Sequence, residues 1–496
     1  MFVSTVFLML AKQRVWNVFC SKDFRFENAG YLIMGLLICI IFYFLNRNFG
    51  ERIEKFLRRW NKVLLASTLV LLLISQMYFS FGGYFESGWD PGVIHDTVSY
   101  EITHEYQNID SSYFSRYPNN KLIVFILTSI ARTVRFCGIK NWEYALVVFQ
   151  LILAVATMFL VFRVSFAITK SYRFSWAAYS IACLFVCISP WYIVVYSDAT
   201  ALIIPLLIIR IYLLSMDSDN KFVRLLSWFL IGVLASIGLL IKPQTFIVCI
   251  AAVIVEILVL LAKRNKQILQ EAVIRLFLLV AGVALFNCIF LYSIAPSLHI
   301  ENDNNASFGY QHYLMMGLNS ETDGIYSDED YNYTLSFSTK EERNEADMQR
   351  FKERIQSYGI KGLMYHLCRK QLVNYGDGTF AWAVEGNSFN GDPKWAQNSS
   401  SNLVRSFIKP DGSHYENFLS YMQLIWVTLV FFLCFVVFYQ NRVLGFNSDQ
   451  CIVLMMLSII GLTLFELLWV NHFFCVLDGY WLRTPPLTEP VRNAAA

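Results

Sequence analysis

Residues 225–262 read LLSWFLIGVLASIGLLIKPQTFIVCIAAVIVEILVLLA, two apolar runs that meet at Lys242 and Pro243. Each run approaches the roughly 20 residues with which a helix crosses about 30 Å of hydrocarbon. Similar runs recur along the 496-residue chain, in which 56% of residues are hydrophobic and 16% are charged. Soluble proteins have roughly 45–50% and 25%. The chain is therefore predicted to be an all-α, multi-pass protein of the cell membrane.

The same pattern predicts about ten transmembrane helices. They are expected at 30–46, 63–81, 143–162, 174–190, 199–215, 225–241, 244–262, 276–294, 418–439 and 450–470. Residues 121–137 are also apolar, but Lys121, Thr128 and Arg132 fall on one helix face. This segment is expected to be an amphipathic juxtamembrane helix at the outer surface.

The basic linkers set the orientation of the chain. Linkers 47–62 and 263–275 are rich in Lys and Arg, which places both on the cytoplasmic side. Two long polar segments, 82–120 and 296–417, then fall outside. The second has 122 residues with 17 Asp and Glu, and it is expected to be a folded extracytoplasmic domain of α+β or mixed type.

These assignments divide the chain into five parts. They are an N-terminal interfacial segment 1–29, a transmembrane core 30–295 that includes an outer catalytic loop 82–120, the extracytoplasmic domain 296–417, the C-terminal transmembrane helices 418–470, and a tail 471–496.

The first outer segment contains two candidate catalytic carboxylates. Asp90 precedes Pro91, and Asp96 follows six residues later. A carboxylate held at a membrane surface beside aromatic residues suits a general base whose substrate is half lipid and half sugar. For a lone aspartate, a solvated loop position is the alternative.

Further charges lie at the expected outer ends of helices, namely Arg116, Asp198 and Lys242. Cations are disfavoured at the outer surface, so each of the two calls for an anionic partner. A lipid phosphate would serve. A snorkelling side chain or a local ion pair is the alternative for each.

Six short strings, each at an expected outer edge, resemble one family. They are WDPGVIHD (89–96), YFSRYPNN (113–120), YSD (196–198), IKP (241–243), HYLMMGLNSETDGIYSDED (312–330) and YGDGTFAW (375–382). Together they resemble the GT-C class of polytopic glycosyltransferases, specifically family 39-like bacterial integral membrane proteins. The resemblance covers about residues 60–468, and the tail 471–496 departs from the family pattern.

The resemblance implies a GT-C-like fold and a glycosyltransferase. It would move a sugar from a polyprenyl-phosphate carrier to a glycan or lipid-linked acceptor of the cell envelope or an exopolysaccharide, on the outer face. Asp90, or else Asp96, would be the catalytic residue, and Arg116 and Lys242 would bind the donor phosphate. The substrate-binding candidates are Tyr117, Asp198, His312, Asp377 and Trp382.

No cofactor or metal is expected, because lysine and arginine can neutralise one phosphate. The net charge of +3 does not suggest nucleic acid. A flippase or other transporter of lipid-linked glycans, and a polysaccharide polymerase, remain as alternatives. A transporter should gather its polar groups near the bilayer midplane.

Two features of the outer domain carry structural expectations. Thr339 followed by Glu342 has the form of a capping box that starts a surface helix. The Gly-rich turn in YGDGTFAW is expected to expose Asp377, with Trp382 available to stack on a sugar. The alternative is that Asp377 only closes its own turn.

Overall fold

The structure is a computed structural model that describes residues 5–6, 9–10, 28–263, 266–380, 382–383, 389, 391, 399–434 and 446–469. All but a few positions of the predicted interfacial segment 1–29 lie outside the described residues. The predicted tail 471–496 lies entirely outside them.

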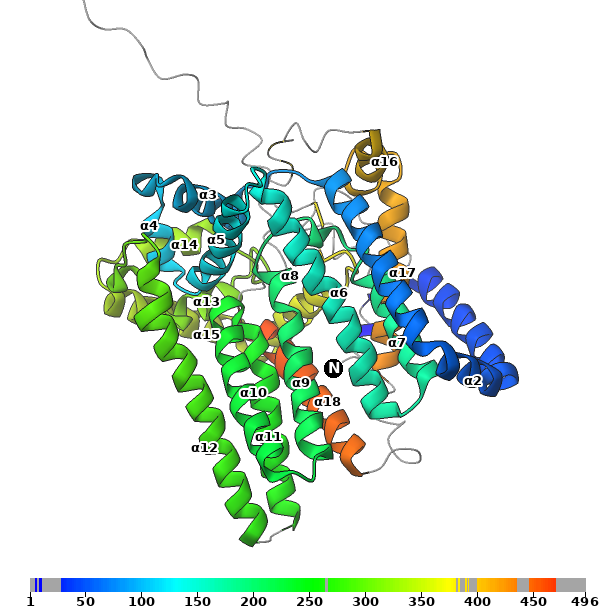
Figure 1. The fold of residues 1–496 in the computed structure, drawn as a ribbon. Coiled ribbons are helices and arrows are strands. Elements are labelled where there is room, and N and C mark those ends of the chain that lie inside the picture. Colours follow the sequence, from blue (N-terminus) through cyan, green and yellow to red (C-terminus); the bar gives the residue numbers. More distant parts are fainter. Residues whose placement is uncertain are drawn as a thin grey trace, which may run out of the picture.

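Long helices run side by side, and short helices gather at one end of the bundle (Figure 1). In the described residues, eight helical segments are long and apolar enough to cross a membrane. They comprise α2 (Asn28–Gly83), α6 (Trp142–Thr169), α8 with α9 (Ser197–Ala201, Ile203–Asp217), α10 (Lys221–Ile241), η4 with α11 (Pro243–Thr245, Phe246–Lys263), α12 with η5 and η6 (Lys266–Ile289, Phe290–Ile294, Ala295–Ser297), α17 (Tyr415–Leu433) and α18 (Phe446–Leu468).

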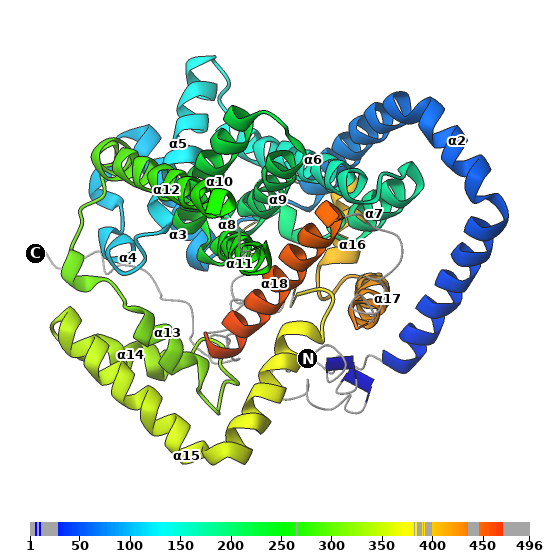
Figure 2. The ribbon, with the colours of Figure 1, turned by 90° about the horizontal axis from the view of Figure 1, so that it is seen from below.

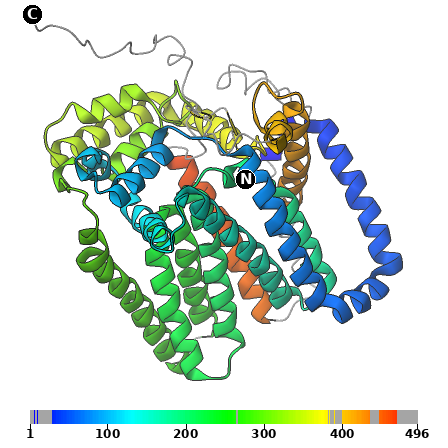
Figure 3. The same cartoon turned by 45° about the horizontal axis from the view of Figure 1, so that its top comes forward.

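The predicted count of ten is thus not supported, for two reasons. The expected helices 30–46 and 63–81 both lie within α2, a single helix of 56 residues that bends and returns toward its starting level (Figure 3). The expected helix 174–190 is represented by α7 (Tyr172–Phe185), which has only 14 residues. At 1.5 Å per residue that helix is about 21 Å long, less than the hydrocarbon thickness.

The bend of α2 is fixed by a contact with α7. The carboxylate of Glu54 accepts hydrogen bonds from the Ser171 hydroxyl and from the backbone N–H groups of Tyr172 and Arg173, at 2.9, 3.1 and 3.0 Å. A carboxylate at a helix N-terminus satisfies free N–H groups and favours the helix dipole. The basic linker 47–62 therefore stays helical and is held against the start of α7.

The expected outer loop 82–120 is largely helical. It contains α3 (Trp89–Thr103), η2 (Tyr106–Asn108) and α4 (Ser111–Arg116). The predicted amphipathic helix is α5 (Asn120–Phe136), which is not among the eight candidate transmembrane segments. Its Arg132 forms an ion pair with the fully buried Glu101 of α3 at 2.8 Å.

The segment 296–417 is helical where it is described, so the expected α+β or mixed domain is corrected. It contains η7 (Asn304–Ala306), α13 (Tyr310–Gly317), α14 (Asp328–Leu335), α15 (Lys340–Tyr375) and α16 (Ser399–Ile408). Among the described residues, the only β pairing is an isolated bridge between Glu86 and Gly391. Side-chain caps explain the helices that follow its Gly- and Asp-rich stretch.

The predicted capping box is confirmed. Glu342 N–H donates to the Thr339 hydroxyl at 3.2 Å, and Thr339 N–H donates to the Glu342 carboxylate at 3.0 Å. Ser327 caps α14 in a similar way, by accepting from the N–H of Asp330. Each such cap stabilises a helix by about 1 kcal/mol.

Candidate functional site

Asp90 lies in the first turn of α3, at the end of the bundle where the short helices gather (Figure 1). A carboxylate is favourable there because of the helix dipole. The preceding Trp89 has φ of 43°, a left-handed conformation that is uncommon outside glycine. This turn carries the chain from the end of α2 into α3 and fixes the direction of Asp90.

Two tyrosine hydroxyls hold the Asp90 carboxylate. Tyr196, 106 residues away in the sequence, donates to Oδ2 at 3.0 Å, and Tyr113 of α4 also hydrogen-bonds to it. Burial raises the pKa of Asp90 above its ordinary value, although both tyrosines and the charge of Lys242 oppose this effect. The Asp90 carboxylate is therefore more basic than a free aspartate, and it lies among polar groups.

Lys242 and Asp198 form an ion pair beside this carboxylate. Lys242 Nζ lies 2.7 Å from Asp198 Oδ1 and 5.8 Å from the centre of the Tyr196 ring. Lys242 caps the end of α10, and Asp198 belongs to the first turn of α8. The other Asp198 oxygen is buried and has no hydrogen-bond partner among the described residues. The structure thus brings together three predicted site residues, Asp90, Asp198 and Lys242, around Tyr196.

Tyr117 joins the same region through a row of aromatic rings. Its ring centre lies 5.1 Å from that of Tyr113 and 5.6 Å from that of Phe308. Phe308 in turn contacts Tyr331, which contacts Tyr326, at 5.7 and 6.0 Å. The row leads from the neighbours of Asp90 toward α14.

Three tyrosines that interact with Asp90 were not predicted as site residues, namely Tyr113, Tyr196 and Tyr313. The negative charge of Asp90 contributes to the raised pKa values of Tyr113 and Tyr313, for which burial is the main cause. All three belong to strings already quoted, namely YFSRYPNN, YSD and HYLMMGLNSETDGIYSDED. The strings alone did not show that their rings converge.

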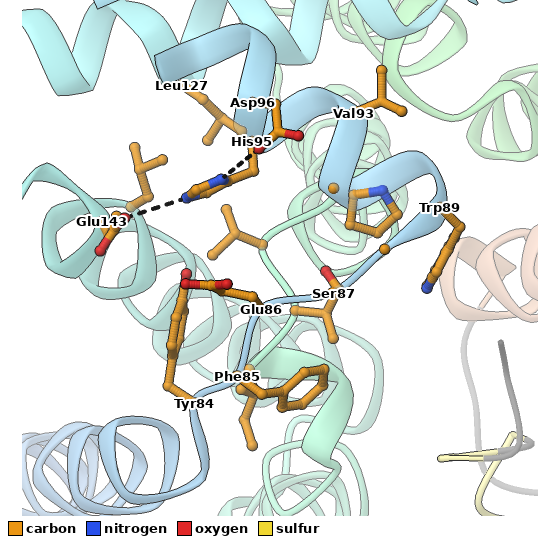
Figure 4. A pocket seen from close by; sticks show the side chains of 17 residues that line it. Tyr84, Phe85, Glu86, Ser87, Trp89, Val93, His95, Asp96, Leu127 and Glu143 are labelled. Carbon is orange, nitrogen blue, oxygen red and sulfur yellow. Dashed lines mark ion pairs between the residues drawn. The ribbon is translucent and has the colours of Figure 1, made fainter. Parts of the chain in front are cut away.

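Asp96 lies elsewhere, because it projects from a different face of α3. Its side chain is 65% exposed, and it lies 3.5 Å from Nδ1 of His95. Nε2 of His95 lies 3.5 Å from Glu143, so the imidazole stands between two carboxylates (Figure 4). Burial lowers the pKa of His95, but these two carboxylates outweigh it and raise the pKa to about 9.

These three residues line a cavity of about 480 Å³. Its walls include Tyr84, Phe85, Glu86, Trp89, Leu127 and Ile193 (Figure 4). Asp90 is not among its lining residues, since its carboxylate turns toward Tyr113 and Tyr196. The cavity and the Asp90 cluster therefore lie on different faces of the first turns of α3.

Arg116 is at the last turn of α4, where its guanidinium donates to the Ser112 hydroxyl at 3.2 Å. Its Nε is buried and has no partner among the described residues. His312 is buried, and its Nδ1 lies 2.7 Å from the Thr334 hydroxyl. Burial lowers the pKa of His312 to about 4, so it is neutral at neutral pH and carries no charge for a phosphate.

The expected exposure of YGDGTFAW is corrected. Asp377 is buried and accepts hydrogen bonds from the backbone N–H and hydroxyl of Thr379, so it closes its own turn. Trp382 is 0% exposed, and its indole N–H donates to the carbonyl oxygen of Ile408 at 2.7 Å. Its ring is covered by the protein and offers no face to a sugar in this structure.

The region that the structure describes contains no group of three or more His, Cys, Asp or Glu side chains arranged to hold a metal ion. The charges of Lys242 and Asp198 both influence the pKa of Asp90, the first lowering it and the second raising it. This arrangement offers a base, a cation and several hydroxyl groups. It is suited to proton transfer beside an anionic group.

The chain belongs to a family of integral membrane proteins: the family model described as "Conserved hypothetical integral membrane protein" matches residues 4–470. Among curated proteins, no similar sequence was found. Among solved structures, the chain is similar to ArnT from Cupriavidus metallidurans bound to undecaprenyl phosphate. The identity is 11%, the match covers 83% of this chain and 77% of that chain, and the TM-score is 0.31.

Proposed function

We propose that this protein is a glycosyltransferase that moves a sugar from a polyprenyl-phosphate carrier to a cell-envelope or exopolysaccharide acceptor. The observation that supports it most is the Asp90 cluster, where a carboxylate, two tyrosine hydroxyls and a lysine meet beside the ends of transmembrane helices. A lipid-linked substrate presents its phosphate at this level, because its polyprenyl chain stays in the bilayer. The motif resemblance to GT-C enzymes agrees with this reading.

The chemistry requires a base and a cation. The acceptor hydroxyl oxygen attacks the anomeric carbon, and the bond from that carbon to the phosphate oxygen breaks. The electron pair leaves with polyprenyl phosphate, and Asp90 takes the hydroxyl proton. Lys242 opposes the negative charge that develops on the leaving phosphate.

In the proposed reaction the two carboxylate oxygens of Asp198 have different roles. Its Oδ1 holds the Lys242 ammonium at 2.7 Å while no phosphate is bound. Its buried Oδ2, which has no partner among the described residues, is placed to accept a hydrogen bond from a sugar hydroxyl. Leaving a buried carboxylate oxygen unpaired costs about 1–3 kcal/mol or more, which a bound polar ligand would offset.

The outer face is the proposed side of catalysis. The basic bend of α2 and the connection between α11 and α12 lie at the end of the bundle opposite to α3 (Figures 1 and 3). Basic connections favour the cytoplasm. If they lie there, Asp90 lies at the outer surface.

The pH dependence of the reaction follows from the raised pKa of Asp90. A base works only when ionised, so kcat/KM should fall as the pH drops through that pKa. The acidic limb is expected above the ordinary value of ~3.9 for a free aspartate. A pH–rate profile from about pH 3 to 9 measures it. An acidic limb at or below the free value would remove Asp90 as the titrating base.

The transmembrane helices give less support to a transporter, because polar groups within them pair with other parts of the protein. Gln150, which lies within α6, donates to the carbonyl oxygens of Tyr192 and Val194 at 2.9 and 2.8 Å. Glu256 of α11 is paired with Arg275 of α12 at 2.9 Å. These groups hold helices and loops together.

An assay in detergent separates the two readings, because a micelle presents no barrier to cross. Purified protein should consume a defined polyprenyl-phosphate sugar and release polyprenyl phosphate when an acceptor is present. Consumption without a membrane barrier excludes pure transport. An unchanged donor across a panel of sugars and acceptors would contradict the proposed transferase.

A further inference from the structure

Helix α15 changes character halfway along its length. Gly359 has φ of 55°, which breaks the helix into two halves. In the first half, 340–358, ten of 19 residues are Asp, Glu, Lys or Arg, whereas the second half, 360–375, has three in 16. All three are positive, namely Lys361, Arg369 and Lys370. The first half has the composition of a solvated helix, and the second half does not.

The second half exposes large apolar side chains. Ile360 is 86% exposed, Met364 57% and Tyr365 60%. A spacing of four residues places Ile360 and Met364 on one side of the helix, and Tyr365 follows Met364 directly in the chain. Exposed apolar groups of this size in a row mark a surface that meets another apolar phase.

Contacts with α18 fix the depth of this half. The apolar segment Gln450–Leu468 has 19 residues, about 28 Å of helix, so Leu468 must lie near one boundary of the hydrocarbon. Lys370 Nζ donates to the carbonyl oxygen of Trp469 at 2.6 Å, which places Lys370 at that boundary. The Tyr375 hydroxyl lies 2.6 Å from that of Thr463, five residues or about 8 Å deeper.

At the end of α15 and just after it, polar backbone groups form hydrogen bonds to side chains of α17, as they would need to do inside a bilayer. The Tyr375 carbonyl accepts from the indole N–H of Trp426, and the Gly376 carbonyl accepts from the amide of Gln423, both at 2.8 Å. Gly378 N–H donates to the Gln423 carbonyl oxygen at 2.8 Å. Irregular backbone at membrane depth persists only where its polar groups are satisfied by the protein.

The orientation of α15 agrees with these contacts. Viewed along the bundle, both halves of α15 extend around the rim of the molecule (Figure 2). The helix therefore crosses the bundle direction and does not rise away from the level of Lys370. Helix α13 packs on it and covers part of its surface.

We propose that the second half of α15 is an interfacial helix that lies against membrane phospholipids and enters the bilayer at its carboxyl end. Ile360, Met364 and Tyr365 would contact the acyl chains. The exposed Lys361 would reach lipid phosphates by extending its apolar stem. This surface continues the lipid-facing surface of α18 and anchors α13, the helix that carries Tyr313.

Photoactivated lipid crosslinking on the wild-type protein tests this assignment. The protein is reconstituted into phosphatidylcholine and phosphatidylglycerol vesicles that contain a lipid with a diazirine on its acyl chain, and adducts are mapped by mass spectrometry. Adducts are expected in 360–368 and, as a positive control, around the 68% exposed Phe277 of α12. None are expected in 341–356.

A variant provides the second arm. Ile360→Glu with Met364→Glu should reduce adducts in 360–368 several-fold and leave those in α12 unchanged, because buried carboxylates are costly in lipid. Labelled α12 with an unlabelled 360–368 segment in the wild type would overturn the proposal. The same pattern would arise if a second copy or a soluble partner covered this face. If the variant does not fold, the wild-type map still decides.

Discussion

Asp90→Asn is expected to reduce turnover by roughly 10²–10⁴-fold, the range for loss of a general base. The amide is nearly isosteric with the carboxylate but cannot take a proton from the acceptor hydroxyl. It can still accept a hydrogen bond from Tyr196, so the fold and the donor KM should change little. Steady-state kinetics with the purified variant, together with its thermal unfolding temperature, measures both effects.

Asp96→Asn is the matched control for this experiment. It makes the same chemical change six residues away on α3, at a side chain that is 65% exposed and lies 3.5 Å from His95. Its turnover should stay close to that of the wild type. A fully active Asp90→Asn beside an inactive Asp96→Asn would move the base to Asp96 and its cavity. Two active variants would exclude a base in this segment.

Lys242→Ala is expected to raise the donor KM by about 10–100-fold. A hydrogen bond to a charged group contributes about 1.5–3 kcal/mol, and each 1.36 kcal/mol corresponds to a factor of ten. The variant also leaves Asp198 without its partner at 2.7 Å, which adds repulsion toward a phosphate. Lys242→Arg keeps the positive charge and should retain part of the binding.

Lys170→Ala serves as the control for the lysine. Lys170 is paired with Asp217 at 3.7 Å, but it follows the end of α6 that lies away from α3 (Figure 1). Its removal should leave the donor KM unchanged. If Lys242→Ala also has the donor KM of the wild type, Lys242 serves only to join α10 to α8.

The sequence predicted the grouping of Asp90, Asp198 and Lys242 because each stands at the end of an apolar run on the same side of the membrane. Hydropathy and the distribution of basic residues determine that side, and they need no knowledge of packing. Which side chain meets which depends on helix rotation and loop geometry. For this reason a local ion pair was only an alternative for Lys242, with Asp198 not named as its partner, and the hydrogen bond from Tyr196 to Asp90 was not expected.

The other differences between prediction and structure also have identifiable physical causes. The runs 30–46 and 63–81 look separate because a charged linker divides them, yet charged residues are good helix formers and α2 continues through it. The expected helix 174–190 counts apolar residues beyond Phe185, where α7 ends. Trp382 looks like a surface aromatic in a Gly-rich turn, but it is buried and contacts Phe85, Trp191 and the carbonyl of Ile408, which come from distant parts of the chain.

The helices of 296–417 show what capping residues can predict and what they cannot. The Thr339 and Glu342 pair predicted the start of α15 correctly, because a capping box is a contact within four residues. The same helix ends in contacts of Tyr375 with α18 and α17, which no local sequence pattern predicts. Local chemistry therefore predicted helix starts better than domain placement.

The measurement that tests the central proposal most directly is the stereochemistry of transfer. Direct attack assisted by a single base, Asp90, inverts the anomeric centre, whereas retention needs a covalent intermediate on a second carboxylate. A donor of known anomeric configuration is incubated with purified protein and acceptor, and the glycoside is examined by NMR. The proposal predicts a product of inverted configuration that is formed at least roughly a hundredfold more slowly by Asp90→Asn. A product of retained configuration, or an Asp90→Asn variant that forms it at the wild-type rate, would contradict it.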